Sequence, residues 1–357
     1  MQITNLKKFL SSKSYKRILI ISGNKSYKKI KADQRIIQFL KNKNLTFFFK
    51  KQSYPEKKEL LKIISIIKKT DPSLIIAIGG GCVMDYAKSA NALACLKKFK
   101  LSNTLSRCYT KLLCIPTTAG SGAEVTPSSV LYINKIKTNL SGKGIKPNYY
   151  CLEPSFIKYN SQYNIASSGF DALSQCIESI LSKKSNAQSI KYAKKSIELI
   201  LGNLTKFYKK KDFNSAYKLS IAANLSGKAI SISNTGAPHA LSYIFSSHFN
   251  LSHGHSVSLN TLKIIKFNYL KSSTNKLVRK RIKIIFKCFK CQNFAQFEKK
   301  FNSILKTIKL EQNYKKLRIN TDKLKRLDKY ISVKRLKNNL IKIEKKDLKK
   351  ILINNYA

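Results

Sequence analysis

The chain has 357 residues, of which 43% are hydrophobic and 10% aromatic, and 70 Lys and Arg against 17 Asp and Glu give it a net charge of +53. This apolar content excludes extensive disorder, and no apolar run reaches the roughly 18–20 residues that span a membrane. The first residues lack the continuous apolar core of a signal peptide, so we expect a soluble, cytoplasmic protein.

Strand and helix patterns alternate in the first half of the chain. Short β-branched or apolar runs predict strands at residues 17–22, 44–49, 74–78 and 112–115, and apolar residues at helical spacing predict helices over residues 28–40 and 59–68. Fully apolar strands joined through helices are typical of a parallel sheet that is covered on both faces.

The second half reads as helical. The 3.6-residue period predicts helices over residues 171–182, 189–208, 215–233, 238–246, 276–288, 296–308 and 346–354. We place a linker at residues 153–168 and expect two domains: an α/β dinucleotide-binding domain over residues 1–165 and a helical metal and substrate domain over residues 166–357.

The lysines are spread along the whole chain and are densest after Lys263, whereas arginine, the better reader of phosphates and bases, is scarce. This distribution indicates a compositional bias toward Lys, Ile and Asn. We expect no specific nucleic-acid partner and no membrane partner, although the charge should attract anionic substrates and cofactors.

Eight cysteines in a chain of this length do not indicate a disulfide framework. Cys82, Cys95, Cys114 and Cys176 have apolar neighbours, and we expect them to be reduced core residues. One CxxC, at residues 288–291, has no second CxxC or nearby histidine and does not indicate a zinc site.

Two polar loops follow predicted strands. Residues 79–81 are three successive glycines before a predicted helix, where the backbone can approach a pyrophosphate and the helix offers unpaired N–H groups. Residues 116–126 (PTTAGSGAEVT) add hydroxyls and further glycines after the next strand. Together the loops predict a dinucleotide site. Asp85 and Lys88 are one helical turn apart, and a simpler interpretation of the two is a surface ion pair.

All four histidines of the chain fall within 17 residues: His239, His248, His253 and His255. In a chain so poor in histidine, this grouping indicates metal binding or proton transfer. Asp171 and Gln175 are four residues apart on a predicted helix and therefore share one face.

Four stretches, residues 79–88, 116–126, 169–178 and 236–254, together resemble the motifs of the iron-containing (group III) alcohol dehydrogenase family in order and spacing. The family's C-terminal signature is similar to residues 335–339, although Leu340 stands where a proline is usual. The resemblance implies an N-terminal Rossmann-like parallel-sheet domain and an all-α C-terminal domain, the fold shared with dehydroquinate synthase, and a divalent metal.

The resemblance implies metal ligands at Asp171, His239 and His253, with Gln175 where the family has a histidine. Because an amide oxygen is a weaker donor than imidazole for Fe²⁺ or Zn²⁺, we expect metal binding to be weakened, or absent if Gln175 cannot ligate. Tyr243 replaces a second family histidine. Tyr243 or His255 is expected to supply the proton.

The cofactor positions that the resemblance carries over are Gly79, Gly80, Gly81, Asp85, Thr117, Thr118 and Ser121. Lys137 matches a lysine that approaches cofactor and substrate. After the first strand, where NAD-preferring relatives often place an aspartate, this chain has Gly23 and Asn24 followed by a lysine. We therefore expect NADPH in preference to NADH.

Residues 171–175, 238–243 and 253–255 look most like the branch that contains phosphonoacetaldehyde reductases. The function expected from this resemblance is NAD(P)H-dependent, metal-assisted reduction of a small anionic aldehyde by a homodimer or larger assembly. Two alternatives remain: a sugar-acid or polyol-phosphate dehydrogenase or a dehydroquinate synthase relative of the same superfamily, and a degenerate, non-catalytic basic protein that binds nucleic acid.

Overall fold

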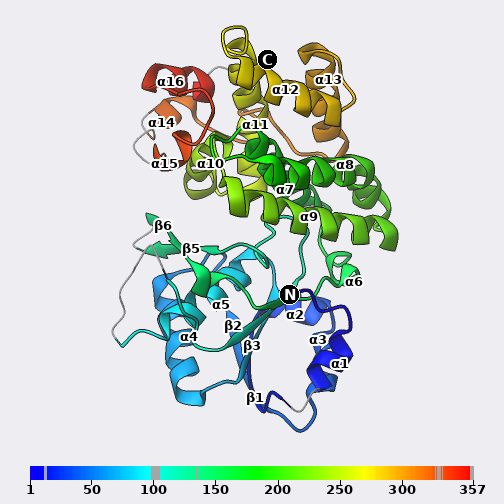
Figure 1. The fold of residues 1–357 in the computed structure, drawn as a ribbon, viewed down its shortest axis with the longest axis vertical. Coiled ribbons are helices and arrows are strands. Elements are labelled where there is room, and N and C mark those ends of the chain that lie inside the picture. The colour runs from blue at the N-terminus through cyan, green and yellow to red at the C-terminus, as the bar shows by residue number, and fades with distance from the viewer. Residues whose placement is uncertain are drawn as a thin grey trace. The chain divides into compact units, whose positions relative to one another are not determined.

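The computed structural model describes residues 1–11, 14–97, 105–133, 136–325, 327, 331 and 333–353. The chain divides into two compact units, Met1–Tyr159 and Asn160–Ala357 (Figure 1). No helix among the described residues is long and apolar enough to cross a membrane.

The first unit contains a five-stranded parallel sheet with the strand order β2-β1-β3-β4-β7. Its strands are β1 (Arg17–Gly23), β2 (Asn44–Lys50), β3 (Leu74–Gly79), β4 (Lys111–Pro116) and β7 (Tyr149–Tyr150). The first four are the predicted strands, and the predicted α/β class is confirmed.

Helices cover both faces of this sheet (Figure 1). Leu19 and Ile21 of β1 pack in one apolar cluster with α4 (Lys57–Thr70) and α5 (Gly81–Leu93). Ile18 and Ile20, which point to the opposite face, pack in another cluster with α1 (Leu6–Ser11), α2 (Asn24–Lys29), α3 (Ala32–Arg35) and η1 (Ile37–Leu40). Burial on both faces explains why the strands are continuously apolar.

Two parts of the first unit differ from the prediction. The single helix expected over residues 28–40 is broken into α2, α3 and η1. Lys31, between α2 and α3, takes a left-handed conformation with φ 52°, and Ile36, between α3 and η1, departs from helical geometry with φ −129°. An unpredicted antiparallel hairpin, β5 (Ser128–Ile133) and β6 (Ile136–Ser141), packs through β5 against α5. Cys95, expected in the core, is exposed.

The second unit is helical, as predicted. Its helices are α7 (Gln162–Ile180), α8 (Ala187–Lys210), α9 (Phe213–Ser233), α10 (Ala237–His248), α11 (His253–Leu270), α12 (Lys276–Cys288), α13 (Phe294–Thr307), α14 (Thr321–Lys325), α15 (Val333–Leu336) and α16 (Lys345–Ile353). The buried helix α7 packs against α8, α9 and α11. This arrangement makes α7 the axis of the unit.

The prediction of a linker at residues 153–168 is wrong. A short helix, α6 (Pro154–Ile157), lies in it, and α7 begins at Gln162 rather than near residue 171. Ser161 is the N-cap of α7, because its side chain accepts a hydrogen bond from the backbone N–H of Asn164 at 3.2 Å. The start of α7 is therefore set by a polar cap that precedes the apolar pattern.

The segment that resembles the C-terminal signature forms buried polar contacts. Asn338 Nδ2 donates to the carbonyl oxygens of Ser233 at 2.9 Å and Thr235 at 3.0 Å, just before α10. Asn339 and Asn268 of α11 exchange two hydrogen bonds of 3.1 Å. These bonds hold the end of α9 and the body of α11 in place.

Candidate metal centre and cofactor loops

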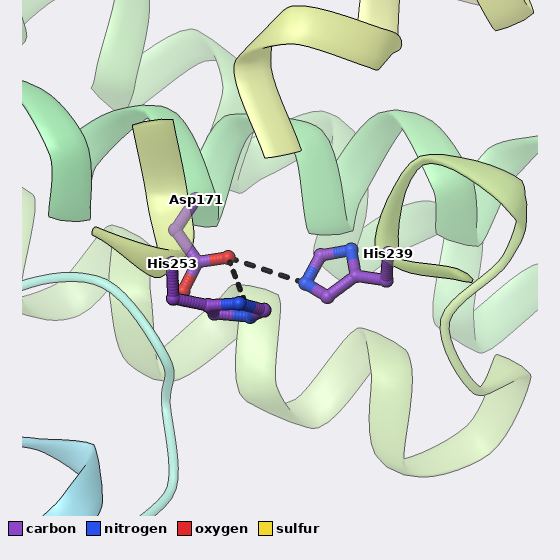
Figure 2. A group of neighbouring side chains, drawn as sticks. All are labelled: Asp171, His239 and His253. Carbon is purple, nitrogen blue, oxygen red and sulfur yellow. Dashed lines mark ion pairs between the residues drawn. The ribbon is translucent and has the colours of Figure 1, made fainter. Parts of the chain in front are cut away.

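Three potential metal ligands lie together in the second unit: Asp171 of α7, His239 of α10 and His253 of α11 (Figure 2). One ligand atom of each lies within 4.8 Å of the other two. Asp171 Oδ1 is 3.2 Å from His239 Nε2 and 3.9 Å from His253 Nε2. Asp171 and His239 are buried, whereas the side chain of His253 is 42% exposed.

The position of His253 depends on the glycine that follows it. A Cβ on Gly254 would lie only 1.9 Å from the carbonyl oxygen of Ser167 and 3.0 Å from Asp171 Cβ. Only glycine therefore allows the first turn of α11 to approach the backbone of α7 so closely. This close approach places His253 beside Asp171.

Glu178 holds His239 from the other side. Its Oε1 lies 2.5 Å from His239 Nδ1, and its Oε2 accepts the backbone N–H of Gly236 at 2.6 Å and that of His239 at 3.4 Å. The carboxylate thus caps the amino end of α10 and fixes the imidazole. With the proton held on Nδ1, Nε2 faces Asp171.

The carboxylates around His239 raise the pKa of its imidazole. Burial by itself would lower the pKa of His239, but the carboxylates of Glu178 and Asp171 raise it to about 9. Below that pH, His239 carries a second proton, on Nε2, and the imidazolium forms an ion pair with the Asp171 carboxylate. A cation held by the same atoms would displace this proton.

The donor set fits a divalent transition metal. One carboxylate oxygen and two imidazole nitrogens are ligands that Fe²⁺ and Zn²⁺ accept. The Glu178 carboxylate on the far nitrogen of His239 is the outer contact that metal-binding histidines usually have. Asp171, His239 and His253 are thus the residues that would hold the ion.

Gln175, the fourth expected ligand, lies one turn after Asp171 and is buried. Its Oε1 accepts a hydrogen bond of 2.8 Å from the hydroxyl of Ser226 on α9. The amide oxygen is therefore bound to α9 in this structure.

His255 and Tyr243, the expected proton donors, differ in their surroundings. His255 Nε2 donates to the carbonyl oxygen of Glu311 at 2.6 Å, so its Nδ1 accepts from the Tyr163 hydroxyl at 3.1 Å. Burial lowers the pKa of His255. Tyr243 is half-buried and lies one helical turn after His239 on α10. Both ring nitrogens of His255 are thus used within the fold.

In the first unit, the two predicted loops lie side by side. The backbone N–H of Thr117 donates to the carbonyl oxygen of Gly79 at 3.0 Å. A Cβ on Gly80 would lie 3.3 Å from Thr118 Oγ1, and one on Gly81 would lie 2.9 Å from Ser121 Oγ. The loops therefore form one surface, at the carboxyl ends of β3 and β4 and the amino end of α5, where backbone N–H groups can reach a phosphate.

Lys88 is fully buried, so the surface ion-pair interpretation of Asp85 and Lys88 is wrong. Its ammonium donates to the carbonyl oxygens of Ala123 at 2.9 Å and Ser128 and to Thr126 Oγ1 at 2.8 Å, and lies 3.9 Å from Asp85 Oδ1. These bonds fix the end of the loop at 116–126 to α5.

The remaining cofactor candidates lie at strand ends. Gly23 ends β1, and Asn24 begins α2. The backbone of Lys137 pairs with Tyr132 in the β5–β6 hairpin, but its side chain is outside the described residues.

Two models of one family match nearly the whole chain. The iron-containing alcohol dehydrogenase model matches residues 1–154, and the C-terminal model of the Fe-containing alcohol dehydrogenase family matches residues 165–356. The chain belongs to the iron-containing alcohol dehydrogenase family. Membership explains why both glycine-containing loops and the Asp171–His239–His253 cluster occur in one chain.

Among curated members of the family, aldehyde-alcohol dehydrogenase 2 of Entamoeba histolytica is 28% identical over 277 residues, which are 72% of this chain and 32% of that protein. Phosphonoacetaldehyde reductase of Streptomyces viridochromogenes is 30% identical over 208 residues, 54% of this chain and 53% of that protein. The alignments thus span about a third and about half of these two relatives. The crystal structure of sulfoacetaldehyde reductase from Bifidobacterium kashiwanohense, in complex with NAD⁺, has the same fold, with a TM-score of 0.86 and 20% identity over 100% of this chain and 96% of that one.

Three residues that contact the candidate site residues had no role predicted from the sequence: Glu178, Ser226 and Tyr163. The sequence could have predicted a role for Glu178, because it lies seven residues after Asp171 and therefore on the same face of α7. Ser226 and Tyr163 contact the site across helices, and their sequence neighbourhoods carry no signal of that packing.

Proposed function

We propose that this chain reduces a small anionic aldehyde to its alcohol with NAD(P)H, and that phosphonoacetaldehyde, reduced to 2-hydroxyethylphosphonate, is the first substrate to test. The carbonyl carbon receives a hydride, the carbonyl oxygen receives a proton, and the nicotinamide is oxidised. The observation that carries this proposal is the Asp171–His239–His253 cluster with Glu178 bound to the far nitrogen of His239.

Asp171, His239 and His253 would hold the divalent ion, Fe²⁺ or Zn²⁺, which when bound supplies a Lewis acid for the substrate oxygen. Glu178 keeps the His239 ring in the orientation that directs Nε2 toward Asp171. Gly254 keeps His253 against α7. The chain therefore orients all three ligands through its own packing.

We assign proton donation to Tyr243, directly or through water, rather than to His255. Tyr243 follows His239 by one helical turn on α10 and is half-buried. His255, whose ring is held between Tyr163 and Glu311, instead fixes the first turn of α11, which begins with His253. His255 is thus a positioning residue in this proposal.

The cofactor pyrophosphate would bind the surface formed by the glycines at 79–81 and the loop at 116–126, with Thr117, Thr118, Ser121 and Asp85 at the positions that family motifs use. Lys137 is proposed to approach cofactor and substrate. The support in this structure is the contact between the two loops.

The anionic substrate class is supported by two relatives. The names of these two relatives contain phosphonoacetaldehyde and sulfoacetaldehyde, which are two-carbon aldehydes that carry an anionic group. The net charge of +53 favours the approach of such substrates.

The test follows NADPH and NADH oxidation at 340 nm with Fe²⁺- or Zn²⁺-loaded protein and a panel of phosphonoacetaldehyde, sulfoacetaldehyde, uncharged aldehydes, sugar acids and polyol phosphates. We expect turnover of phosphonoacetaldehyde that chelation abolishes and that His253→Ala reduces by at least about 100-fold while the circular dichroism spectrum is retained. Turnover that survives chelation would contradict the metal role. Turnover only of sugar acids or polyol phosphates would move the substrate to that class, and no oxidation of either cofactor would contradict the proposed activity.

A further inference from the structure

The carboxyl ends of β1 and β2 place a lysine beside the position expected to contact the adenosine ribose. In the parallel register Gly23 of β1 pairs with Lys50 of β2, and β3, on the other side of β1, continues into the glycine loop. At such an edge of dinucleotide-binding sheets, a carboxylate selects the ribose hydroxyls of NAD, whereas a cation accommodates the 2′-phosphate of NADP. The side chains at this edge therefore bear on cofactor choice.

The Lys50 side chain lies close to Gly23. A Cβ on Gly23 would be 3.7 Å from Lys50 Cε. The Lys50 ammonium donates to the carbonyl oxygen of Gln52 at 2.6 Å, and since an ammonium has three N–H donors, it retains donors for a further acceptor. This hydrogen bond holds the Lys50 ammonium at the end of β2 and leaves N–H donors for a ligand.

The neighbouring thiol of Cys82 does not neutralise the Lys50 ammonium. Cys82, in the first turn of α5, lies within hydrogen-bonding reach of the Lys50 ammonium. Burial raises the pKa of the Cys82 thiol to about 12, so the thiol is uncharged at neutral pH.

The neighbouring carboxylate does not serve the ribose either. Glu59 is buried, and its Oε1 accepts the backbone N–H of Lys51 at 2.8 Å while its Oε2 accepts the Tyr86 hydroxyl at 2.6 Å. Ser22 donates its hydroxyl to the carbonyl oxygen of Ile78. The end of β1 itself, with Ser22 and Gly23, contributes no carboxylate.

We infer that Lys50 is a specificity-determining residue for the cofactor, because its ammonium binds the 2′-phosphate of NADPH. The inference rests on the proposed function, since it requires a dinucleotide on the glycine loop. It goes beyond that function by assigning the choice between NADPH and NADH to one side chain. An ammonium at this place pairs with a phosphate dianion and has no equivalent partner on NADH.

The test measures binding rather than turnover. Dissociation constants for NADPH and NADH are obtained from the change in nicotinamide fluorescence as each cofactor is titrated with the full-length protein. We expect Lys50→Ala to raise the dissociation constant for NADPH about 10-fold or more and to leave that for NADH within about 2-fold. The NADPH preference should also decline as ionic strength rises.

Lys51→Ala is the matched control, because Lys51 is the adjacent lysine, is exposed, and uses its backbone rather than its side chain to bind Glu59. It should change neither dissociation constant by more than about 2-fold. A second variant, Gly23→Asp, tests the same contact without removing Lys50. Its carboxylate would approach Lys50 and repel the 2′-phosphate, so the preference should shift toward NADH.

Two results would overturn the inference while leaving the proposed function in place: binding of NADPH and NADH with equal affinity, or loss of affinity for both in Lys50→Ala. A wild-type protein that binds neither cofactor would overturn the proposed function and this inference together. Thermal denaturation of each variant separates a lost contact from a lost fold.

Discussion

Glu178 and His239 are joined by a buried contact of 2.5 Å between Oε1 and Nδ1, and the other oxygen of Glu178 caps the helix on which His239 lies. One carboxylate thus sets the position of α10 and the orientation of its imidazole. Because α7 carries both Glu178 and Asp171, this helix holds His239 from two sides. The geometry of the metal centre is therefore determined mainly by a single helix.

Replacing Glu178 tests this dependence. We expect Glu178→Gln to lower the affinity for Zn²⁺ or Fe²⁺ by about 10- to 100-fold, because an amide holds the imidazole less strongly and adds an N–H donor near Nδ1. Competition with a chromophoric chelator measures the affinity.

The control for Glu178→Gln is Glu198→Gln, which removes an exposed carboxylate on α8 that pairs with Lys195 at 3.4 Å. It should leave metal affinity unchanged. Equal metal affinity in wild type and Glu178→Gln would show that the contact does not orient His239.

The bond between Gln175 and Ser226 gives a second prediction. With the amide oxygen bound to α9, Asp171, His239 and His253 would hold the ion, and an imidazole at position 175 would add a stronger donor than the amide. We expect Gln175→His to raise metal affinity by about 10-fold or more. The electronic spectrum of the Co²⁺-loaded protein should change as the coordination sphere gains a nitrogen.

Gln175→Leu separates the two possible states of the wild-type amide. If Gln175 stays on Ser226, this variant keeps the wild-type metal affinity to within about 3-fold, although it leaves the buried Ser226 hydroxyl with one acceptor fewer. A loss of about 10-fold or more would show that Gln175 ligates the ion after all.

The sequence predicted the sheet well because fully buried strands carry a continuous apolar signal, as in Leu74–Gly79. It also brought Asp171, His239 and His253 together, since family motifs preserve their order. The break at Lys31 was missed because a left-handed residue leaves no mark on the apolar period. The Gln175–Ser226 and His255–Tyr163 contacts were missed because they depend on how helices distant in sequence pack.

The burial of Lys88 was also missed from the sequence, because it depends on how the loop at 116–126 packs against α5. It supplies a third prediction. Its ammonium satisfies the carbonyl oxygens of Ala123 and Ser128 inside the first unit. We expect Lys88→Met to destabilise the protein by about 2–3 kcal/mol, because these oxygens would lose their charged donor. It should also weaken cofactor binding, since the loop at 116–126 would lose its anchor.

Thermal or urea denaturation of Lys88→Met measures this cost, and Lys62→Met, at an exposed position of α4, is the control for replacing a lysine as such. Wild-type stability in Lys88→Met would mean that the carbonyl oxygens find other donors.

The buried lysine of α11 predicts a pH dependence of stability. Lys263 donates to the Tyr314 hydroxyl at 2.8 Å, and its ammonium lies 4.4 Å from the centre of that ring. Burial lowers the pKa of Lys263 from 10.5 to about 8. Below pH 8 the lysine is charged in both states and the folded state bears the cost of burial, whereas between pH 8 and 10.5 the unfolded chain binds more protons, so stability rises with pH.

We therefore expect wild type to gain about 2–3 kcal/mol of stability relative to Lys263→Met between about pH 7 and pH 10. Urea denaturation of both proteins across this range measures the difference, in which the titration of all other lysines cancels. Lys280→Met, at an exposed position of α12, is the control for replacing a lysine as such. A constant difference between wild type and Lys263→Met would mean that Lys263 keeps its proton in the folded state up to its ordinary pKa, with its ammonium hydrated despite the packing of Tyr314.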